Sequence, residues 1–195
     1  MKPSPVKDIA KEVFRKYQLH PSVESTQQLA DLLEMQKYRY RTQIFKEGDS
    51  VTHIYYLERG LVRLTHKDTD GADIVDAFCL EDGMLISNDL FTEKPAVQTA
   101  TTIEPTFLFT LPYASLQHYA TVNRDFTELL CAIFEEHILD REKYIQLLSQ
   151  SPQERFETMN KEHSEIIWRS PAKDIASYLR MRPETLSRIR YRGQK

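Results

Sequence analysis

Cysteine, glycine and long apolar runs are all scarce in this chain of 195 residues. Its two cysteines, Cys79 and Cys131, are too few for a four-thiolate zinc or iron–sulfur site and indicate reduced thiols in a cytoplasm. No apolar run approaches the roughly 18 residues that span a bilayer, and the first residues lack the apolar core of a secretory signal. We therefore expect a cytoplasmic protein with no membrane partner and no bound metal.

The sequence motifs of common catalytic classes are also missing. No Gly-x-Ser-x-Gly, P-loop or His-Glu-x-x-His pattern is present. A metal oxygenase built on a β-barrel is the competing class, and it would need histidines and carboxylates clustered on adjacent strands. Only His53 and His66 fall on expected strands, and the chain has no His-x-His pair. We expect no catalytic residue and no enzyme.

The charge that is present is unevenly distributed. Residues 151–195 carry 10 Lys and Arg against 6 Asp and Glu, a net charge of +4, whereas residues 1–150 carry a net charge of −7. A basic end on an acidic body suits a protein that presents one end to a polyanion such as DNA. A solvated surface helix would be equally basic, so the charge supports this interpretation without deciding it.

The stretch from Ser170 to Arg190 has the pattern of two short helices joined by a tight turn. Ser170 is the expected N-cap, with Pro171 at the first helical position, and Pro183 opens the second helix with its φ already fixed. The second helix is polar and basic on its free face, as in a helix-turn-helix whose second helix enters the DNA major groove. An ordinary helical hairpin with a solvated face is the alternative.

Two different periodicities precede this stretch. Residues 6–35 have helical spacing, with Ser25 or Thr26 as the expected cap of a second helix. From Arg39 the period changes to two, and glycines separate short strands at roughly ten-residue intervals, which predicts an antiparallel sandwich or barrel. Near the C-terminal end, we expect Trp168 in the core of a small domain that opens with a capping box at Ser151.

A long helix of roughly 25 residues, about 38 Å, is predicted between the strands and the C-terminal helices. It is apolar on a wide face, which favours packing against a second copy as a short coiled coil while the strand region covers the rest. Burial of the whole face within one chain is the alternative. The residues of the expected dimer helix are Phe126, Leu130, Ile133, Phe134, His137, Ile138, Arg141 and Ile145.

The order of these features resembles the cyclic-AMP receptor protein/fumarate–nitrate regulator (Crp/Fnr) superfamily. The resemblance rests on Phe45-Lys-Glu-Gly-Asp49, on residues 55–64, on Asp70-Gly71 and on the runs at 174–179 and 183–190. It implies an α+β fold with an antiparallel β-roll of the double-stranded β-helix or jelly-roll type with flanking helices, a long dimerisation helix and a small all-α helix-turn-helix domain. We expect boundaries at 1–120, 121–150 and 151–195, the last without a full wing.

The ligand cassette departs from this family. In members that bind cyclic AMP, a Gly-Glu pair and an Arg-Ser pair hold the cyclic phosphate and the ribose. Here Ser87-Asn88 and Gln98-Thr99 occupy those positions, so that motif places no cation beside a phosphate, and Lys94 is a candidate substitute. We expect no cyclic-AMP binding of the usual kind. The pocket either holds another, unidentified small-molecule effector or is vestigial.

The resemblance also assigns roles on the second helix. Glu184 suits a cytosine amino group and Arg188 suits guanine, whereas Pro183 replaces a residue that is often basic. The turn carries Arg180-Met-Arg182 where the family usually has glycine, so we expect a non-glycine residue with positive φ. The remaining expected DNA contacts are Lys173, Thr185, Ser187, Arg190 and Arg192.

The predicted function is therefore a sequence-specific transcription regulator that binds double-stranded DNA. A homodimer would present two recognition helices to a near-palindromic site. RNA polymerase is a candidate further partner. The alternative is a ligand-sensing or scaffolding dimer that binds little or no DNA. The sequence alone leaves open the effector, the operator and the sign of regulation.

Overall fold

A computed structural model describes residues 5–92 and 94–192, and its strand region confirms the predicted β-roll. Two four-stranded sheets have the orders β1-β8-β3-β6 and β2-β7-β4-β5, and every strand pair is antiparallel. The strands are β1 (Glu34–Tyr38), β2 (Gln43–Phe45), β3 (His53–Arg59), β4 (Val62–Lys67), β5 (Asp73–Cys79), β6 (Met84–Leu85), β7 (Thr99–Thr102) and β8 (Thr106–Pro112).

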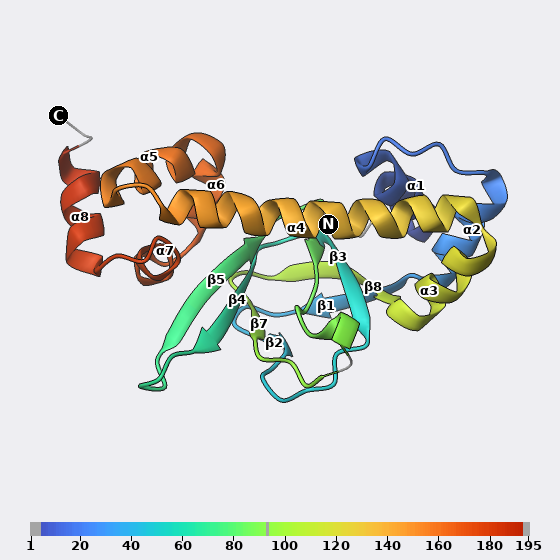
Figure 1. The fold of residues 1–195 in the computed structure, drawn as a ribbon, viewed down its shortest axis with the longest axis horizontal. Helices are drawn as coiled ribbons and strands as arrows, with labels where there is room; N and C mark the ends of the chain where they lie inside the picture. The colour runs from blue at the N-terminus through green and yellow to red at the C-terminus, as the bar shows by residue number, and fades with distance from the viewer. Residues whose placement is uncertain (1–4, 93, 193–195) are drawn as a thin grey trace.

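Helices gather at both ends of one long helix, which runs across the β-roll (Figure 1). This long helix, α4, has 25 residues, as the sequence predicts. Three helices lie at one end of α4 and four at the other, with a short 3-10 helix in the β-roll. The helices are α1 (Val6–Lys16), α2 (Val23–Leu32), η1 (Leu90–Thr92), α3 (Tyr113–Val122), α4 (Arg124–Leu148), α5 (Pro152–Glu162), α6 (Ser164–Arg169), α7 (Ala172–Tyr178) and α8 (Pro183–Arg192).

The first helices differ from the sequence prediction in one detail. Ser22 caps α2 by accepting a hydrogen bond from the Ser25 backbone N–H, so neither Ser25 nor Thr26 is the cap. Ser25 is fully buried instead, and its hydroxyl accepts a hydrogen bond from the side chain of Asn123 just before α4. Ser25 is the third residue of α2, and its side chain faces the segment before α4, so its hydroxyl bonds to Asn123 and does not cap the helix.

The sheet that contains β3 and β8 is buried on both faces because its side chains alternate. Along β3, Tyr55 and Leu57 point into the core between the two sheets, whereas Ile54 and Tyr56 pack against the helices. The helix-side cluster also contains Phe126 of α4. The first half of α4 is therefore fixed to the β-roll by its own chain.

A third hydrophobic cluster joins the β-roll to the C-terminal helices. Leu61 and Ile103 of the β-roll are buried in the same cluster as residues of α5 to α8, among them Ile175 and Leu186. The prediction for Trp168 is wrong, since its side chain is 83% exposed. Ile166 and Ile167 occupy the inward face of the six-residue helix α6. The next residue, Trp168, therefore lies on the solvent side.

An arginine at the end of α6 adds a polar contact beside this cluster. The guanidinium of Arg169 donates hydrogen bonds to the carboxylates of Glu81 and Glu104, both in turns of the β-roll. It also donates to the backbone carbonyl of Gly60, at 2.8 Å. Arg169 thus links three turns of the β-roll to the helices.

Candidate DNA-binding surface and effector pocket

Helix α7 begins one residue later than the sequence predicts. Pro171 is the residue before the helix, with φ −57° and ψ 138°, and its carbonyl accepts from the backbone N–H groups of Asp174 and Ile175. The cap predicted at Ser170 is therefore wrong. Its hydroxyl is buried and has no hydrogen-bond partner within the described ranges. The extended ψ of Pro171 moves the first helical residue beyond the reach of that hydroxyl.

The turn between α7 and α8 confirms two predictions. Arg180 has φ +51°, so a non-glycine residue does adopt the left-handed conformation there. Pro183 is the first residue of α8. Helix α5 supports this turn, because the guanidinium of Arg155 donates to the carbonyl of Leu179 at 2.7 Å. The turn is held in place by a neighbouring helix and does not depend on glycine.

Helix α8 has a buried side and an exposed polar side. Leu186 is 1% exposed and anchors the helix in the third cluster. The side chains of Glu184, Ser187 and Arg188 are exposed, as is Lys173 on α7. These side chains are free to approach a ligand as large as DNA.

The other expected DNA contacts lie differently. Thr185 is half-buried, and its hydroxyl accepts a weak hydrogen bond from Arg188 at 3.4 Å. The guanidinium of Arg190 lies 5.9 Å from the centre of the Phe156 ring, which turns this side chain toward α5. The side chain of Arg192 is outside the described part of the structure. Of the two side chains expected to contact bases, Glu184 and Arg188, both are exposed.

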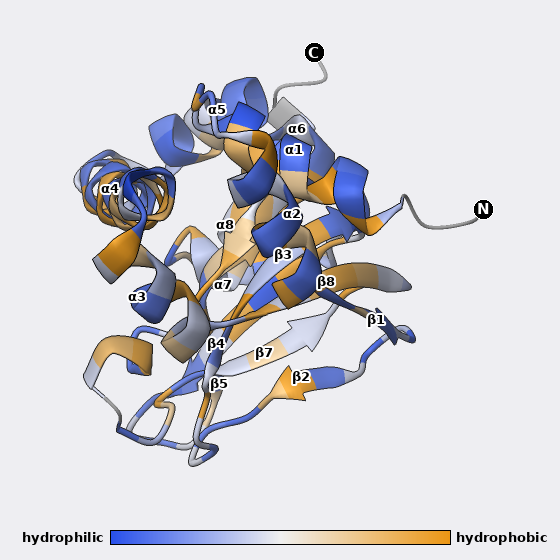
Figure 2. Cartoon of the chain, turned by 90° about the vertical axis from the view of Figure 1, so that its right-hand side faces the viewer, coloured by the Kyte–Doolittle hydropathy of each residue, from blue (hydrophilic) through white to orange (hydrophobic). Residues whose placement is uncertain are grey.

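Helix α4 buries one stripe of its apolar residues and leaves another uncovered. Phe126 and Ile133 are 0% exposed, whereas Ile138 is 58% and Ile145 is 67% exposed. Figure 2 looks along α4 and shows it at one side of the molecule, with a flank turned away from the rest of the chain. Among the other expected dimer residues, Arg141 is exposed, and the half-buried ones are Leu130, Phe134 and His137.

A cavity of about 240 Å³ lies between the β-roll and α4. Two of the four predicted effector residues, Asn88 and Gln98, line it, whereas Ser87 and Thr99 do not. The hydroxyl of Thr99 accepts from the backbone N–H of Glu47, and the buried hydroxyl of Ser87 has no partner among residues 5–92 and 94–192. Lys94 is exposed and does not belong to the residues that line the cavity.

The cavity wall has an acidic balance. It carries three carboxylates, Asp76, Glu136 and Asp140, against the single guanidinium of Arg141. Burial, followed by the nearby Arg141, lowers the pKa of His137 on the same wall, which favours the uncharged ring. Two of these carboxylates are already ion-paired with cations that do not line the cavity, Asp76 with Arg180 and Glu136 with Lys16.

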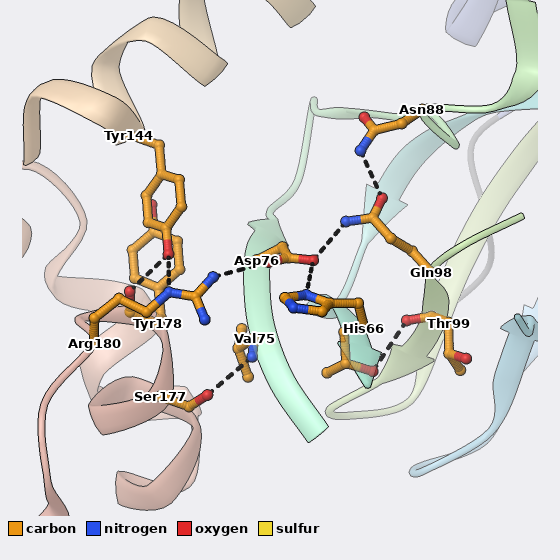
Figure 3. A network of polar contacts seen from close by, with 11 residues as sticks. His66, Val75, Asp76, Asn88, Gln98, Thr99, Tyr144, Ser177, Tyr178 and Arg180 are labelled. Carbon is orange, nitrogen blue, oxygen red and sulfur yellow. Dashed lines mark hydrogen bonds and ion pairs between the residues drawn. The ribbon is translucent and has the colours of Figure 1, made fainter. Parts of the chain in front are cut away.

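A carboxylate that the sequence analysis missed is at the centre of the polar contacts beside the cavity. Oδ2 of Asp76 accepts from the side chain of Gln98 at 2.8 Å and lies 2.7 Å from Nδ1 of His66 (Figure 3). Asn88 in turn donates to Gln98 at 3.0 Å. The only signal in the sequence was a carboxylate inside the apolar run from Ile74 to Cys79.

Comparison with known proteins agrees with this architecture. Residues 35–122 match the family model of the cyclic nucleotide-binding domain. The anaerobic regulatory protein of Haemophilus influenzae is 25% identical over 181 residues, which cover 86% of this chain and 70% of that protein. The chain is thus similar to a regulatory protein along most of its length and contains a β-roll of the cyclic nucleotide-binding type.

Solved structures of Crp/Fnr proteins share the fold. FixK2 from Bradyrhizobium japonicum has a TM-score of 0.72 and 21% identity, over 82% of this chain and 83% of that one. The c-di-GMP-responsive global regulator CLP of Xanthomonas campestris has a TM-score of 0.68 and 17% identity, over 89% and 92% of the two chains.

The described residues lack two features, a membrane-spanning helix and a metal-binding cluster. Within residues 5–92 and 94–192, no helix combines the length and the apolar character needed to cross a membrane. The same residues contain no group of three or more His, Cys, Asp or Glu side chains arranged to hold a metal ion.

Proposed function

We propose that this protein is a sequence-specific transcription regulator of the Crp/Fnr type, which binds a near-palindromic DNA site as a homodimer. The observation that supports this proposal most strongly is the exposed pair Glu184 and Arg188 on α8, a helix whose other side is anchored by Leu186. In a two-fold dimer the two copies of α8 would enter successive major grooves roughly 34 Å apart. RNA polymerase is the candidate partner that would bind the dimer on DNA.

Base recognition by Arg188 gives a first testable prediction. Arg188→Ala should weaken binding to the cognate site by about 1–3 kcal/mol and relax the preference at one base pair in each half-site. The measurement is selection from a random duplex pool at physiological salt, followed by titration of the enriched duplex with wild type and variant.

The matched control for this experiment is Arg15→Ala, an exposed arginine on α1 at the far end of α4. It removes the same charge from the molecule and should leave the selected sequence unchanged. Enrichment of the same site by wild type and Arg188→Ala, with equal affinity, would contradict the assignment. Binding without enrichment in any of the three proteins would favour the alternative, a sensing or scaffolding dimer.

We propose no catalytic role. The relatives with assigned roles are regulatory proteins, and the polar groups near the cavity are paired with one another rather than arranged around a nucleophile. The cavity is better suited to binding than to chemistry.

The cavity should not take a cyclic nucleotide. Gln98, which stands at the family's arginine position, carries no charge, and its amide is engaged by Asp76 and Asn88. A phosphate at that position would lose its water without gaining a charged partner from Gln98, so an uncharged effector fits better there.

This reasoning predicts that 1 mM cyclic AMP leaves the melting temperature of the protein unchanged. A ligand present at 100 times its Kd would add about 2.7 kcal/mol to the free energy of unfolding, which differential scanning fluorimetry resolves easily. Adenosine serves as the control ligand, because it keeps the base and sugar without the cyclic phosphate. A saturable rise with cyclic AMP that adenosine does not give would contradict the prediction.

A further inference from the structure

A second cavity, of about 530 Å³, lies outside the β-roll where the C-terminal half of α4 meets α5 and the end of α7. We call it the α4–α5 cavity. Small-molecule sites in proteins have volumes of about 300–1,000 Å³, so this one can hold a small ligand. Met159 and Glu162 line this cavity and not the one between the β-roll and α4. The residues that line both are Asp140, Tyr144, His163 and Tyr178.

The α4–α5 cavity opens on the side of α4 that faces away from the proposed dimer contact. Asp140 and Leu147 follow Ile138 and Ile145 by two residues each, which is about 200° around a helix of 3.6 residues per turn. The uncovered stripe of α4 and the cavity therefore lie on nearly opposite faces. A second copy packed on that stripe would leave the cavity accessible.

The floor of the cavity is apolar and aromatic. Leu147 is 8% and Met159 is 2% exposed. The rings of Tyr144 and Tyr178 stack beside them with their centres 4.8 Å apart (Figure 3). Such a floor accepts the apolar body of a ligand, and the face of a tyrosine ring attracts a cation.

Two carboxylates, Asp140 and Glu162, border this floor, against the single ammonium of Lys143. Nζ of Lys143 lies 3.5 Å from Oδ1 of Asp140, but the two side chains are 73% and 64% exposed, so this ion pair is weak. Burial raises the pKa of Tyr178, and its neighbours Tyr144, Asp140 and Glu162 raise it further. Both carboxylates therefore place negative potential at the Tyr178 hydroxyl.

Two polar groups of the cavity have no partner. Within residues 5–92 and 94–192, neither the hydroxyl of Tyr178 nor the carboxylate of Glu162 makes a hydrogen bond or an ion pair with another side chain or with the backbone. By contrast, the hydroxyl of Thr158 on the same wall donates to the side chain of Gln150 at 3.0 Å. Tyr178 and Glu162 are thus available to accept hydrogen bonds from a ligand.

We propose that the α4–α5 cavity binds a small organic cation, an amine that carries an apolar body. Its ammonium group donates to the carboxylate of Glu162 and to the hydroxyl oxygen of Tyr178, while its apolar body lies on Leu147 and Met159. This site is separate from the effector cavity and from the DNA-binding helix. The proposal needs neither an effector in the β-roll nor DNA.

Isothermal titration calorimetry on the full chain without DNA tests the proposal, with 2-phenylethylamine as the probe. The amine should bind saturably with a Kd of about 1 mM or lower, which the ligand efficiency of so small a molecule allows. The matched control ligand is 3-phenylpropionate, which has the same apolar body and the opposite charge and should not bind. Absence of amine binding, or equal binding of amine and acid, would overturn the proposal.

Glu162→Gln tests the role of charge, because it keeps the size of the side chain. It should raise the Kd of the amine about fivefold, the effect expected for an ion pair at a partly exposed site. Glu157→Gln is the matched control, since it removes the same charge from α5 at an exposed position that does not line the cavity. It should leave the Kd unchanged. Equal effects of the two variants would mean that the amine responds only to the overall charge of the helix, and the site would be refuted.

Tyr178→Phe separates a binding role from a structural one. It keeps the ring that stacks on Tyr144 and removes a hydroxyl that has no partner among the described residues. The Kd of the amine should rise about threefold or more, because one hydrogen bond to the ligand is lost. The melting temperature of the free protein should not change. An unchanged Kd would contradict the role of this hydroxyl.

The position of the bound amine is read directly by NMR. Protons of its phenyl ring should show nuclear Overhauser effects to the methyl group of Met159, which lines only the α4–α5 cavity. Effects to Ile86 and Leu64 in their place would put the amine in the cavity of the β-roll and would overturn the assignment. Because no DNA is present in any of these measurements, failure of the proposed regulator role would leave their results unaffected.

Discussion

Ile138→Glu combined with Ile145→Glu is expected to yield a monomer whose affinity for the selected palindromic duplex is at least about 100-fold lower than that of wild type. Both side chains lie on the uncovered stripe of α4. Burial of an isoleucine side chain contributes about 1.5–3 kcal/mol, and a dimer loses this contribution four times while gaining four unpaired carboxylates. A monomer also loses bivalent attachment to DNA, which accounts for about 10²–10⁴ in affinity.

Sedimentation velocity and titration of the selected duplex measure this effect. The control is Val23→Glu, an apolar-to-charged change at a side chain of α2 that is 89% exposed. It should leave both the dimer and the affinity unchanged. A double variant of α4 that still sediments as a dimer would contradict the proposed interface.

The thiols provide an independent readout of the same interface. Burial raises the pKa of Cys79 to about 12, so this thiol is unreactive at pH 8. Cys131 is exposed and lies seven residues before Ile138, on the same stripe of α4. A thiol reagent should therefore modify Cys131 slowly in wild type and fast in the double variant. Equal rates would place the interface elsewhere.

Gly60→Ala should lower the free energy of unfolding by about 2–6 kcal/mol, a large effect for the addition of one methyl group. Gly60 has φ +119°, and a Cβ atom there would lie 2.9 Å from the backbone Cα of Thr106. Backbone cannot move aside as a flexible side chain can. The Gly60 carbonyl also accepts from Arg169, so a shift would disturb the contact to α6.

The measurement is urea unfolding followed by circular dichroism. Gly71→Ala is the matched control, because Gly71 also has positive φ, +81°, but nothing lies within 4 Å of a Cβ built there. It should cost only the backbone strain, about 1–3 kcal/mol. Equal losses in the two variants would show that strain, rather than contact with Thr106, sets the cost at Gly60.

Features encoded within a few consecutive residues were predictable from the sequence. The capping box of Ser151 and Glu154 is present, with both of its hydrogen bonds formed. The length of α4, the start of α8 at Pro183 and the positive φ in the turn at Arg180 are also confirmed. Each depends on local propensity or helical periodicity, which the sequence displays directly.

Features that depend on contacts between distant segments were not predictable. Ser170 has the residue type of a cap, but its place is decided by the conformation of Pro171. Trp168 belongs to an apolar run whose inward face holds only two residues. Asp76 is central only because folding brings Gln98 and Arg180 to opposite sides of one carboxylate. No sequence spacing carries that information.

Leu61 and Ile103 are buried against the C-terminal helices, so those helices cannot be exchanged independently of the β-roll. Both β-roll side chains lie in the hydrophobic cluster of α5 to α8. A chimera cut at residue 151 would join two surfaces shaped for other partners and leave apolar area without a matching counterpart. A chimera that receives the C-terminal helices of a relative should therefore also receive the relative's residues at positions 61 and 103, because these side chains pack against those helices. The β-roll and the C-terminal helices therefore share one packed core.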